Sequence, residues 1–418
     1  MTFPTLDAWL QALEQRHPSA IDLGLERVGQ VADRLAARRF AVPVITVAGT
    51  NGKGSTVATL VAIARAAGWR VASYTSPHLI RFNERICLDG EPVADADLVR
   101  ALDAVEAARG DVSLTYFEHT TLAAFWWFQR QQPDLVVLEV GLGGRLDAVN
   151  LVDADVAVIT SVDLDHQDWL GDTRAQIARE KAGIMRAGRP VVLGEREPQP
   201  VLLELAAALA APAAIKGHDY DFTVGTDGWS WQGAAFGRLD ALPLPGLACE
   251  NAATALAALQ ALAGVSALRV DATAIRAGLP LAAVSGRAQR IATAPDIWLD
   301  VGHNPHGVRF LWQHLPPATA GQETHAVFAM LRDKDIDGVI AASAAQVTHW
   351  WPAGLDVARG CSLAELVAKL RAQGLQPAGE HESVTAALAA ARQQARADDR
   401  IVVFGSFHTV AAILASGD

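Results

Sequence analysis

The stretch from Val44 to Thr56 constrains the fold more than any other part of the chain. An apolar, β-branched run ends in the glycine-rich turn GTNGKGST, and an alanine-rich amphipathic segment that reaches Ala67 follows at once. This order of strand, glycine loop and helix is typical of a phosphate site, because glycines let backbone N–H groups approach phosphate oxygens while a lysine supplies positive charge. The sequence therefore predicts a nucleotide-binding α/β domain.

The spelling of this loop departs from the standard pattern G-x-x-x-x-G-K-[ST]. Val47 stands where the first glycine would fall, and Gly54 separates Lys53 from the hydroxyl of Ser55. A solvated glycine turn is the alternative interpretation, and the strand and helix on either side disfavour it. The loop is therefore interpreted as a variant phosphate loop.

Length and composition narrow the class of protein. The 418 residues exceed one ordinary core and predict two domains, and 51% apolar with 19% charged residues indicates a globular chain. The formal net charge of -11 argues against a nucleic-acid or anionic-membrane surface. The three cysteines are far apart, and neither a secretory signal nor an uncharged apolar run of about 18 residues is visible. We expect a cytoplasmic, monomeric protein without nucleic-acid or membrane partners.

Strands alternate with helices along most of the chain. This alternation predicts α/β architecture: an N-terminal P-loop ATPase domain with a mostly parallel, doubly wound sheet, and a smaller C-terminal Rossmann-like α/β domain. Residues 5–40 are expected to be helical, and residues 216–245 to form a short antiparallel excursion. Helical patterning gives way before Gly286-Arg287, so we place the domains at 1–285 and 286–418.

Polar side chains close several of the expected strands or turns of the first domain. Ser55, Ser76, Glu139 and His166 are of this kind, and open parallel sheets bind ligands at the edge where such strands end. Glu139 alone is equally consistent with a surface carboxylate, and His166 alone with a core or cap histidine. With a phosphate loop in the same sheet, the interpretation as Mg²⁺ ligands is favoured over these alternatives.

The second domain carries no second phosphate loop but has three polar strand ends. They are residues 299–306, which contain Asp300 and two histidines, residues 332–335, and residues 405–409. Each alone is consistent with a solvated loop, whereas three together favour a second substrate site. The role of Lys181 is ambiguous, because the residue could simply be a solvated lysine on a helix, paired with a neighbouring acid.

With these motifs laid out, the chain closely resembles the dihydrofolate synthase/folylpolyglutamate synthase family of the Mur ligase superfamily. The resemblance covers nearly the whole length. It is carried by residues 21–28, 49–55, 75–79, 114–118, 138–148, 165–166, 179–183, 251–255, 300–305 and 405–409. The chain departs from the family's pattern at Ser285, where proline is usual, and at Gly302, where alanine is usual.

The resemblance implies ATP-dependent joining of L-glutamate to dihydropteroate and to the γ-carboxyl of folates, through an acyl phosphate. It implies ATP and two Mg²⁺ ions as cofactors, and it matches Lys181 to a carbamylated lysine. The implied ATP contacts are Thr50, Asn51, Gly52, Lys53, Gly54, Ser55, Asn251, Arg287 and Asp300, and the implied Mg²⁺ ligands are Ser76, Glu139 and His166. The implied dihydropteroate contacts are Asp22, Leu23, Gly24, Thr115, Tyr116, Phe117, Glu118, Leu146, Asp147 and Ala148. The implied catalytic residues are Lys53, Lys181, His303 and Ser406.

Three alternatives remain open at this point. A Mur-type cell-wall ligase shares the phosphate loop but leaves the stretches at 22–24 and 115–118 unexplained. A nucleotide-dependent switch would leave the polar strand ends of the second domain idle, and no N-K-x-D or T-K-x-D guanine-reading segment is present. A binding-only module fits least, because the nucleotide loop, the acidic strand end and the distal histidine and serine are all intact.

Overall fold

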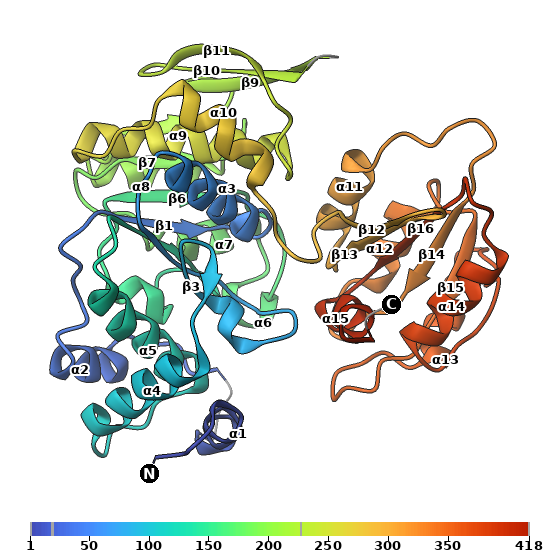
Figure 1. Cartoon of the computed structure of the whole chain (residues 1–418), viewed down its shortest axis with the longest axis horizontal. Helices are drawn as coiled ribbons and strands as arrows, with labels where there is room; N and C mark the ends of the chain where they lie inside the picture. The colour runs from blue at the N-terminus through green and yellow to red at the C-terminus, as the bar shows by residue number, and fades with distance from the viewer. Residues whose placement is uncertain (1, 18–20, 226–227, 417–418) are drawn as a thin grey trace. The chain divides into compact units, whose positions relative to one another are not determined.

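The computed structural model describes residues 2–17, 21–225 and 228–416. The chain divides into two compact units, residues 1–283 and 284–418, which are described separately below (Figure 1). The separate functions expected for the predicted domains 1–285 and 286–418 remain predictions.

Unit 1 is built on an eight-stranded sheet in the order β4-β3-β2-β5-β1-β6-β7-β8. The strands from β2 to β8 in this order run parallel, whereas β3 and β4 pair antiparallel at one edge. The bounds are β1 (Val44–Ala48), β2 (Val71–Tyr74), β3 (Ile86–Leu88), β4 (Glu91–Pro92), β5 (Leu135–Glu139), β6 (Val156–Ile159), β7 (Val191–Leu193) and β8 (Ala213–Ile215).

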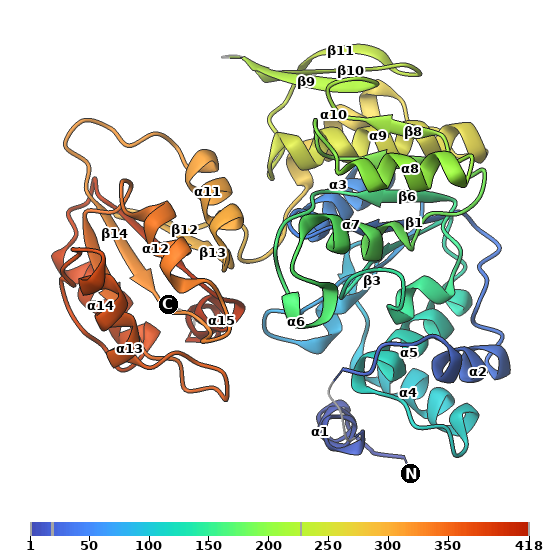
Figure 2. The ribbon, with the colours of Figure 1, turned by 180° about the vertical axis from the view of Figure 1, so that it is seen from behind.

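Helices cover both faces of this sheet (Figures 1 and 2). Alternate residues of a strand face opposite sides, so Val136 and Leu138 of β5 pack with one helix set while Leu135 and Val137 pack with the other. The first set is α1 (Leu6–Arg16), α2 (Glu26–Arg34), α4 (Asp95–Arg109) and α5 (Tyr116–Gln131). The second is α3 (Lys53–Ala66), α9 (Cys249–Val265) and α10 (Ala272–Gly278). Under β6 and β7 lie α7 (Arg174–Ala182) and α8 (Pro200–Ala208).

The remaining elements of unit 1 are short. A three-stranded antiparallel sheet, β9 (Tyr220–Gly225), β10 (Gly228–Gly233) and β11 (Gly237–Leu242), packs on α9 through the buried Trp229 and Trp231. The short helices are η1 (Phe82–Arg85), η2 (Ala148–Leu151), η3 (Leu279–Leu281) and α6 (Gln167–Leu170).

Unit 2 is a five-stranded sheet in the order β12-β13-β16-β14-β15, in which only β12 pairs antiparallel among the described strands. Its strands are β12 (Gln289–Thr293), β13 (Asp296–Asp300), β14 (Thr324–Phe328), β15 (His349–Pro352) and β16 (Arg400–Phe404). Its helices are α11 (Pro305–His314), α12 (Ile336–Ser343), α13 (Leu363–Ala372), α14 (Val384–Gln394) and α15 (Phe407–Ser416).

The predicted fold class is confirmed, and the differences lie in individual elements. Helix α3 begins at Lys53 rather than at Val57, because Gly52 takes a left-handed conformation (φ 87°) that turns the chain directly into the helix. The strands β3, β4, β8 and β12 were not predicted; they lie at or next to the sheet edges and are less buried than the central strands, whose continuous apolar runs are easier to recognise. Among the described residues, no helix is both long and apolar enough to cross a membrane.

Candidate active site

The phosphate loop connects β1 to α3 at the carboxyl edge of the large sheet. Parallel pairing places Val47 beside Glu139 of β5 and beside Val158 of β6, so the ends of these three strands lie together. The ammonium group of Lys53 folds back over its own loop, where Nζ donates to the carbonyl oxygens of Gly49 (3.0 Å) and Thr50 (3.2 Å). The loop is therefore a compact turn with a cation at its mouth.

The segment after β6 holds this loop in place. The backbone N–H of Thr50 donates to the carbonyl of Ser161 (2.8 Å), and that of Asn51 donates to the Ser161 hydroxyl (3.1 Å). The Thr50 hydroxyl donates to the carbonyl of Asp163 (3.1 Å) and accepts from its N–H (3.0 Å). The backbone N–H groups of Thr50 and Asn51 therefore already have acceptors. The first N–H groups of α3 have no acceptor within the helix, so they are better placed to donate hydrogen bonds to a phosphate.

Ser161 and Asp163 are not among the predicted site residues. Asn251, predicted to contact the nucleotide, lies at the first turn of α9, and its amide occupies the space that a side chain at Gly52 would need. The close approach explains why this position is a glycine.

Glu139 and Ser76, two predicted metal ligands, meet beside the phosphate loop. The backbone N–H of Ser76 donates to Glu139 Oε2 (3.3 Å), and the Glu139 side chain is buried. A Cβ at Gly54 would lie 3.7 Å from Glu139 Oε2. The third predicted ligand, His166, begins α6 with a left-handed backbone, 3.9 Å from the carboxylate of Asp165. Carboxylate, hydroxyl and imidazole groups suit a divalent cation, and Glu139 and Ser76 already lie beside the phosphate loop.

Lys181 is buried in α7, contrary to the solvated-lysine alternative; 3% of it is exposed. Burial, followed by the nearby charge of Lys53, lowers its pKa to about 7, while Asp165 and Asp147 act in the opposite direction. A lysine in this state has a substantial neutral fraction near pH 7, and a neutral amine is a nucleophile.

The predicted dihydropteroate segments lie next to this centre. Thr115 caps α5 in a reciprocal capping box with Glu118, and Phe117 packs against Gly141, where an added Cβ would also lie 3.3 Å from Ser76 Oγ. The carboxylate of Asp147 accepts from the N–H groups of Leu142 (2.8 Å) and Val149 (2.9 Å), and so shapes the loop that contains Leu146 and Ala148.

Asp147 is fully enclosed, and burial raises its pKa to about 6 against the opposing effects of loop amides and Lys53. Its oxygens bind the loop in which it resides, so the geometry favours shaping of the loop over direct contact with a ligand.

In unit 2, Asp300 ends β13 and organises the turn that follows. It accepts from the N–H groups of Ala288 (2.8 Å) and Gly302 (2.6 Å), and the Arg287 guanidinium lies 3.9 Å away. Burial raises the pKa of Asp300, opposed first by Arg287. His303 Nδ1 lies 2.9 Å from the carbonyl of Val301, so Nδ1 carries the proton of the neutral ring and Nε2 the lone pair.

Ser406 is buried at the start of α15. Its hydroxyl accepts from the N–H of Thr409 (3.0 Å) and lies 2.7 Å from the Thr409 hydroxyl, which itself donates to the carbonyl of Ala329 (2.7 Å). The Ser406 proton is therefore directed to Thr409. These contacts are those of a helix cap.

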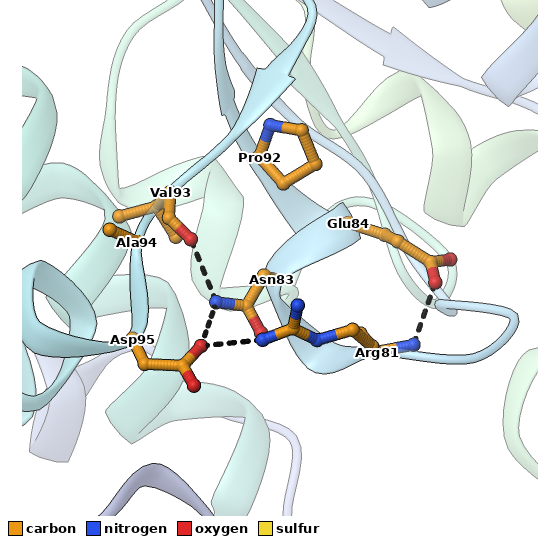
Figure 3. Close-up of a pocket in the computed structure, with 7 residues that line it drawn as sticks. All are labelled: Arg81, Asn83, Glu84, Pro92, Val93, Ala94 and Asp95. Atoms are coloured by element: carbon orange, nitrogen blue, oxygen red, sulfur yellow. Dashed lines mark hydrogen bonds and ion pairs between the residues drawn. The ribbon is translucent and has the colours of Figure 1, made fainter.

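A hollow of about 560 Å³ in unit 1 lies beside β4 and η1 (Figure 3). The Arg81 guanidinium pairs with Asp95 (2.8 Å), and Asn83 donates to Asp95 (2.8 Å) and to the carbonyl of Val93 (2.7 Å). Glu84 accepts from three successive backbone N–H groups, from Leu79 to Arg81. These groups satisfy one another, and the hollow contains none of the predicted site residues. Its walls brace the loop that carries Ser76.

At the amino-terminal ends of β14 and β15 in unit 2, three side chains offer possible metal-ligand atoms within 4.8 Å of one another. They belong to Glu323, His325 and His349. The indole N–H of Trp351 donates to His325 Nδ1 (3.2 Å), so the neutral His325 ring holds its proton on Nε2. That nitrogen then has no lone pair for a metal, and we assign the cluster to packing.

The chain matches two domains of the Mur ligases. The Mur ligase middle domain matches residues 47–194, and the Mur ligase glutamate ligase domain matches residues 286–407. The dihydrofolate synthase/folylpolyglutamate synthase of Escherichia coli K12 is 44% identical, over 98% of this chain and 94% of that protein. The chain belongs to the dihydrofolate synthase/folylpolyglutamate synthase family of Mur ligases. The Haemophilus influenzae member of this family is 40% identical, over 97% and 96% of the two chains.

Solved structures of the family have the same fold. The E. coli protein in complex with DHPP and ADP superimposes with a TM-score of 0.93 at 44% identity, over 99% of this chain and 98% of that one. The bifunctional synthase of Yersinia pestis with AMPPNP and Mn ion superimposes with a TM-score of 0.92, also at 44% identity and over the same shares. The family therefore accounts for the whole architecture, from α1 to α15.

Proposed function

We propose that this chain is an ATP-dependent ligase that joins L-glutamate to dihydropteroate, making dihydrofolate, and to the γ-carboxyl of folates. The observation that carries the proposal is the meeting of two sites at Gly141. There Phe117 of a predicted dihydropteroate segment packs beside Ser76, which in turn contacts Glu139 at the phosphate loop. A carboxylic acid bound along this segment would lie close to the nucleotide.

The chemistry explains why a nucleotide site and an acid site must adjoin. A carboxylate is a poor electrophile, and its oxygen is a poor leaving group. Transfer of the γ-phosphoryl group of ATP to the carboxylate gives ADP and an acyl phosphate, with Lys53 offsetting charge on the phosphoryl oxygens. The amine of glutamate then attacks the carbonyl carbon, phosphate leaves, and the amine loses a proton as the amide forms.

We assign the metal to Ser76, Glu139 and His166, since the first two already meet beside the loop. Bound Mg²⁺ would neutralise phosphate charge there. The buried, partly neutral amine of Lys181 suits carbamylation, in which the nitrogen attacks CO₂, loses a proton and becomes an anionic carbamate. The product would replace an unfavourable buried cation next to Lys53 by an anion.

Further roles follow the family's pattern. We assign Asn251, Arg287 and Asp300 to ATP binding. We assign His303 and Ser406 to the step that adds glutamate, and Ser406 acts there through the helix cap that it forms. His303 carries its lone pair on Nε2, which suits it to orient the amine or accept its proton. We place the reaction in the cytoplasm, where ATP is supplied.

A glutamate-dependent ADP-release assay tests the proposal, run with dihydropteroate and then with tetrahydrofolate. We expect release with both acids, and only when glutamate is present. A UDP-linked muropeptide acid serves as the control acceptor and is expected to give none. ADP release without any amino-acid requirement would contradict the proposal.

A further inference from the structure

Arg27, in the first turn of α2, joins two segments that are far apart in the sequence. Its guanidinium reaches Asp22 through NH1 (2.6 Å to Oδ2) and Glu118 through NH2 (3.0 Å to Oε1), and NH2 also donates to the carbonyl of Asp22 (3.2 Å). Asp22 and Glu118 belong to the two separate stretches, 22–24 and 115–118, that the family's pattern connects with dihydropteroate. One side chain therefore bridges both.

The Glu118 end of this bridge is firmly held. Glu118 is 4% exposed, and its second carboxylate oxygen accepts from the N–H of Thr115 (2.7 Å), which closes the capping box of α5. The residues between them, Tyr116 and Phe117, form the first turn of this helix. A shift of Glu118 would move both aromatic rings, so the Arg27 contact bears on the ring that packs against Gly141.

The Asp22 end is a loop without regular structure. Arg27 contacts both its carboxylate and its carbonyl, which restrains the backbone as well as the side chain. The Asp22 side chain is 39% exposed, and His17 Nε2 also lies 3.7 Å from its carboxylate. The arginine ties this loop to α5.

The Nε donor of Arg27 indicates what fixes the position of the guanidinium. Its Nε is buried and has no hydrogen-bond partner among the described residues. A buried donor without an acceptor is unfavourable for stability, so the position of the guanidinium is best explained by its two carboxylates. A planar fork can hold two carboxylates at a set distance, which the single ammonium of lysine does not do.

We infer that Arg27 is a positioning residue for the pterin-bearing substrate: it sets the spacing between the 22–24 loop and the start of α5. The inference rests on the proposed function and deepens it, because it names a residue that holds the two parts of the proposed dihydropteroate site together. Arg27 acts through Asp22 and Glu118. The contacts of Arg27 described above do not involve the nucleotide site. Replacing Arg27 should therefore weaken binding of the acid substrate selectively.

The test compares Arg27→Gln and Arg27→Lys with the control Arg16→Gln in the full-length enzyme. Arg16 is a matched control, because it joins a different helix pair through Glu106 (2.6 Å) and its partner is equally buried. The readouts are kcat and KM from ADP release with dihydropteroate, ATP or glutamate varied in turn, together with thermal unfolding of each variant.

We expect Arg27→Gln to raise the KM for dihydropteroate by about tenfold or more, with the KM for ATP within about twofold of wild type. Arg27→Lys, which keeps the charge and protects folding, should still show a raised KM for dihydropteroate. Arg16→Gln should lower the unfolding temperature while leaving all three KM values unchanged.

The inference alone is overturned by an unchanged KM for dihydropteroate in an active Arg27→Gln enzyme, or by full recovery in Arg27→Lys, which would show that charge suffices. Equal increases in the KM for ATP and for dihydropteroate would also overturn it, since they would indicate a general structural role. Wild-type enzyme without dihydropteroate-dependent ADP release would overturn the proposed function together with this inference.

Discussion

The carboxyl edges of the two sheets handle charge in opposite ways. In unit 1, Lys181 is buried near Lys53, and the two cations disfavour each other. In unit 2, Asp300 and Ser406 accept hydrogen bonds from neighbouring backbone N–H groups, and the Val301 carbonyl holds Nδ1 of His303. The first edge is electrostatically suited to receive anions, whereas the second is a stabilised framework. This comparison teaches that clustered polar residues after strands do not by themselves indicate the same kind of site.

The largest expected effect is at the unit 1 edge. Lys53→Ala removes the cation at the mouth of the phosphate loop, and we expect ADP release and amide formation to fall by a factor on the order of 1,000. Both activities should be lost together, because the lysine serves the phosphoryl group. Near wild-type turnover of the purified variant would show that the loop has been wrongly assigned.

The next effect tests the unit 2 edge. His303→Ala should leave ATP binding intact, as measured by calorimetry, and reduce the rate of ligation by about 100-fold. The imidazole is oriented by the Val301 carbonyl and lies outside the phosphate loop. Unchanged ligation kinetics would remove His303 from the mechanism.

A stability measurement examines the buried lysine directly. Lys181 has a pKa of about 7 in the folded state and about 10.5 in the unfolded chain. Between these values the unfolded chain binds the extra proton, so the contribution of Lys181 to folding becomes more favourable as the pH rises from 7 to 10.5. Below pH 7 the unfavourable contribution is at its greatest.

Lys181→Met should therefore raise the free energy of unfolding in CO₂-free buffer near pH 6, by an amount on the order of a few kcal/mol. This gain should shrink toward pH 10, as followed by urea denaturation of both proteins. A pH-independent difference between the two would indicate that the lysine is not buried as a cation.

The smallest expected effect is at Ser406. Ser406→Ala removes a helix cap and should lower the free energy of unfolding by about 1 kcal/mol. Because the hydroxyl is engaged by Thr409, kcat should stay within a few-fold of wild type in the ADP-release assay. A loss comparable to that of His303→Ala would instead give Ser406 a direct part in the reaction.

Much of the fold followed from local patterns in the sequence. The strand before Gly49 and the strand ending at Glu139 were both predicted, because each is a continuous apolar run that ends in a polar or glycine-rich turn. The strands β3, β4, β8 and β12 were not predicted, because they are only partly buried at or next to the sheet edges and lack the strong signal of a central, fully buried strand. Strand ends predicted Ser55, Ser76, Glu139, His166 and Asp300 as site residues, whereas the other site residues remain predictions that the family resemblance implies.

The sequence by itself determined the α/β class, the phosphate loop and the family, because these depend on the order of residues along short stretches. Only the tertiary structure showed that Lys181 is buried rather than solvated and that Ser161 engages the Asn51 amide. It also showed that Arg27 bridges Asp22 and Glu118, and that Glu118 lies 91 residues further along the chain than the arginine. Burial and long-range ion pairing depend on which distant segments pack together, and no local pattern in the chain encodes that.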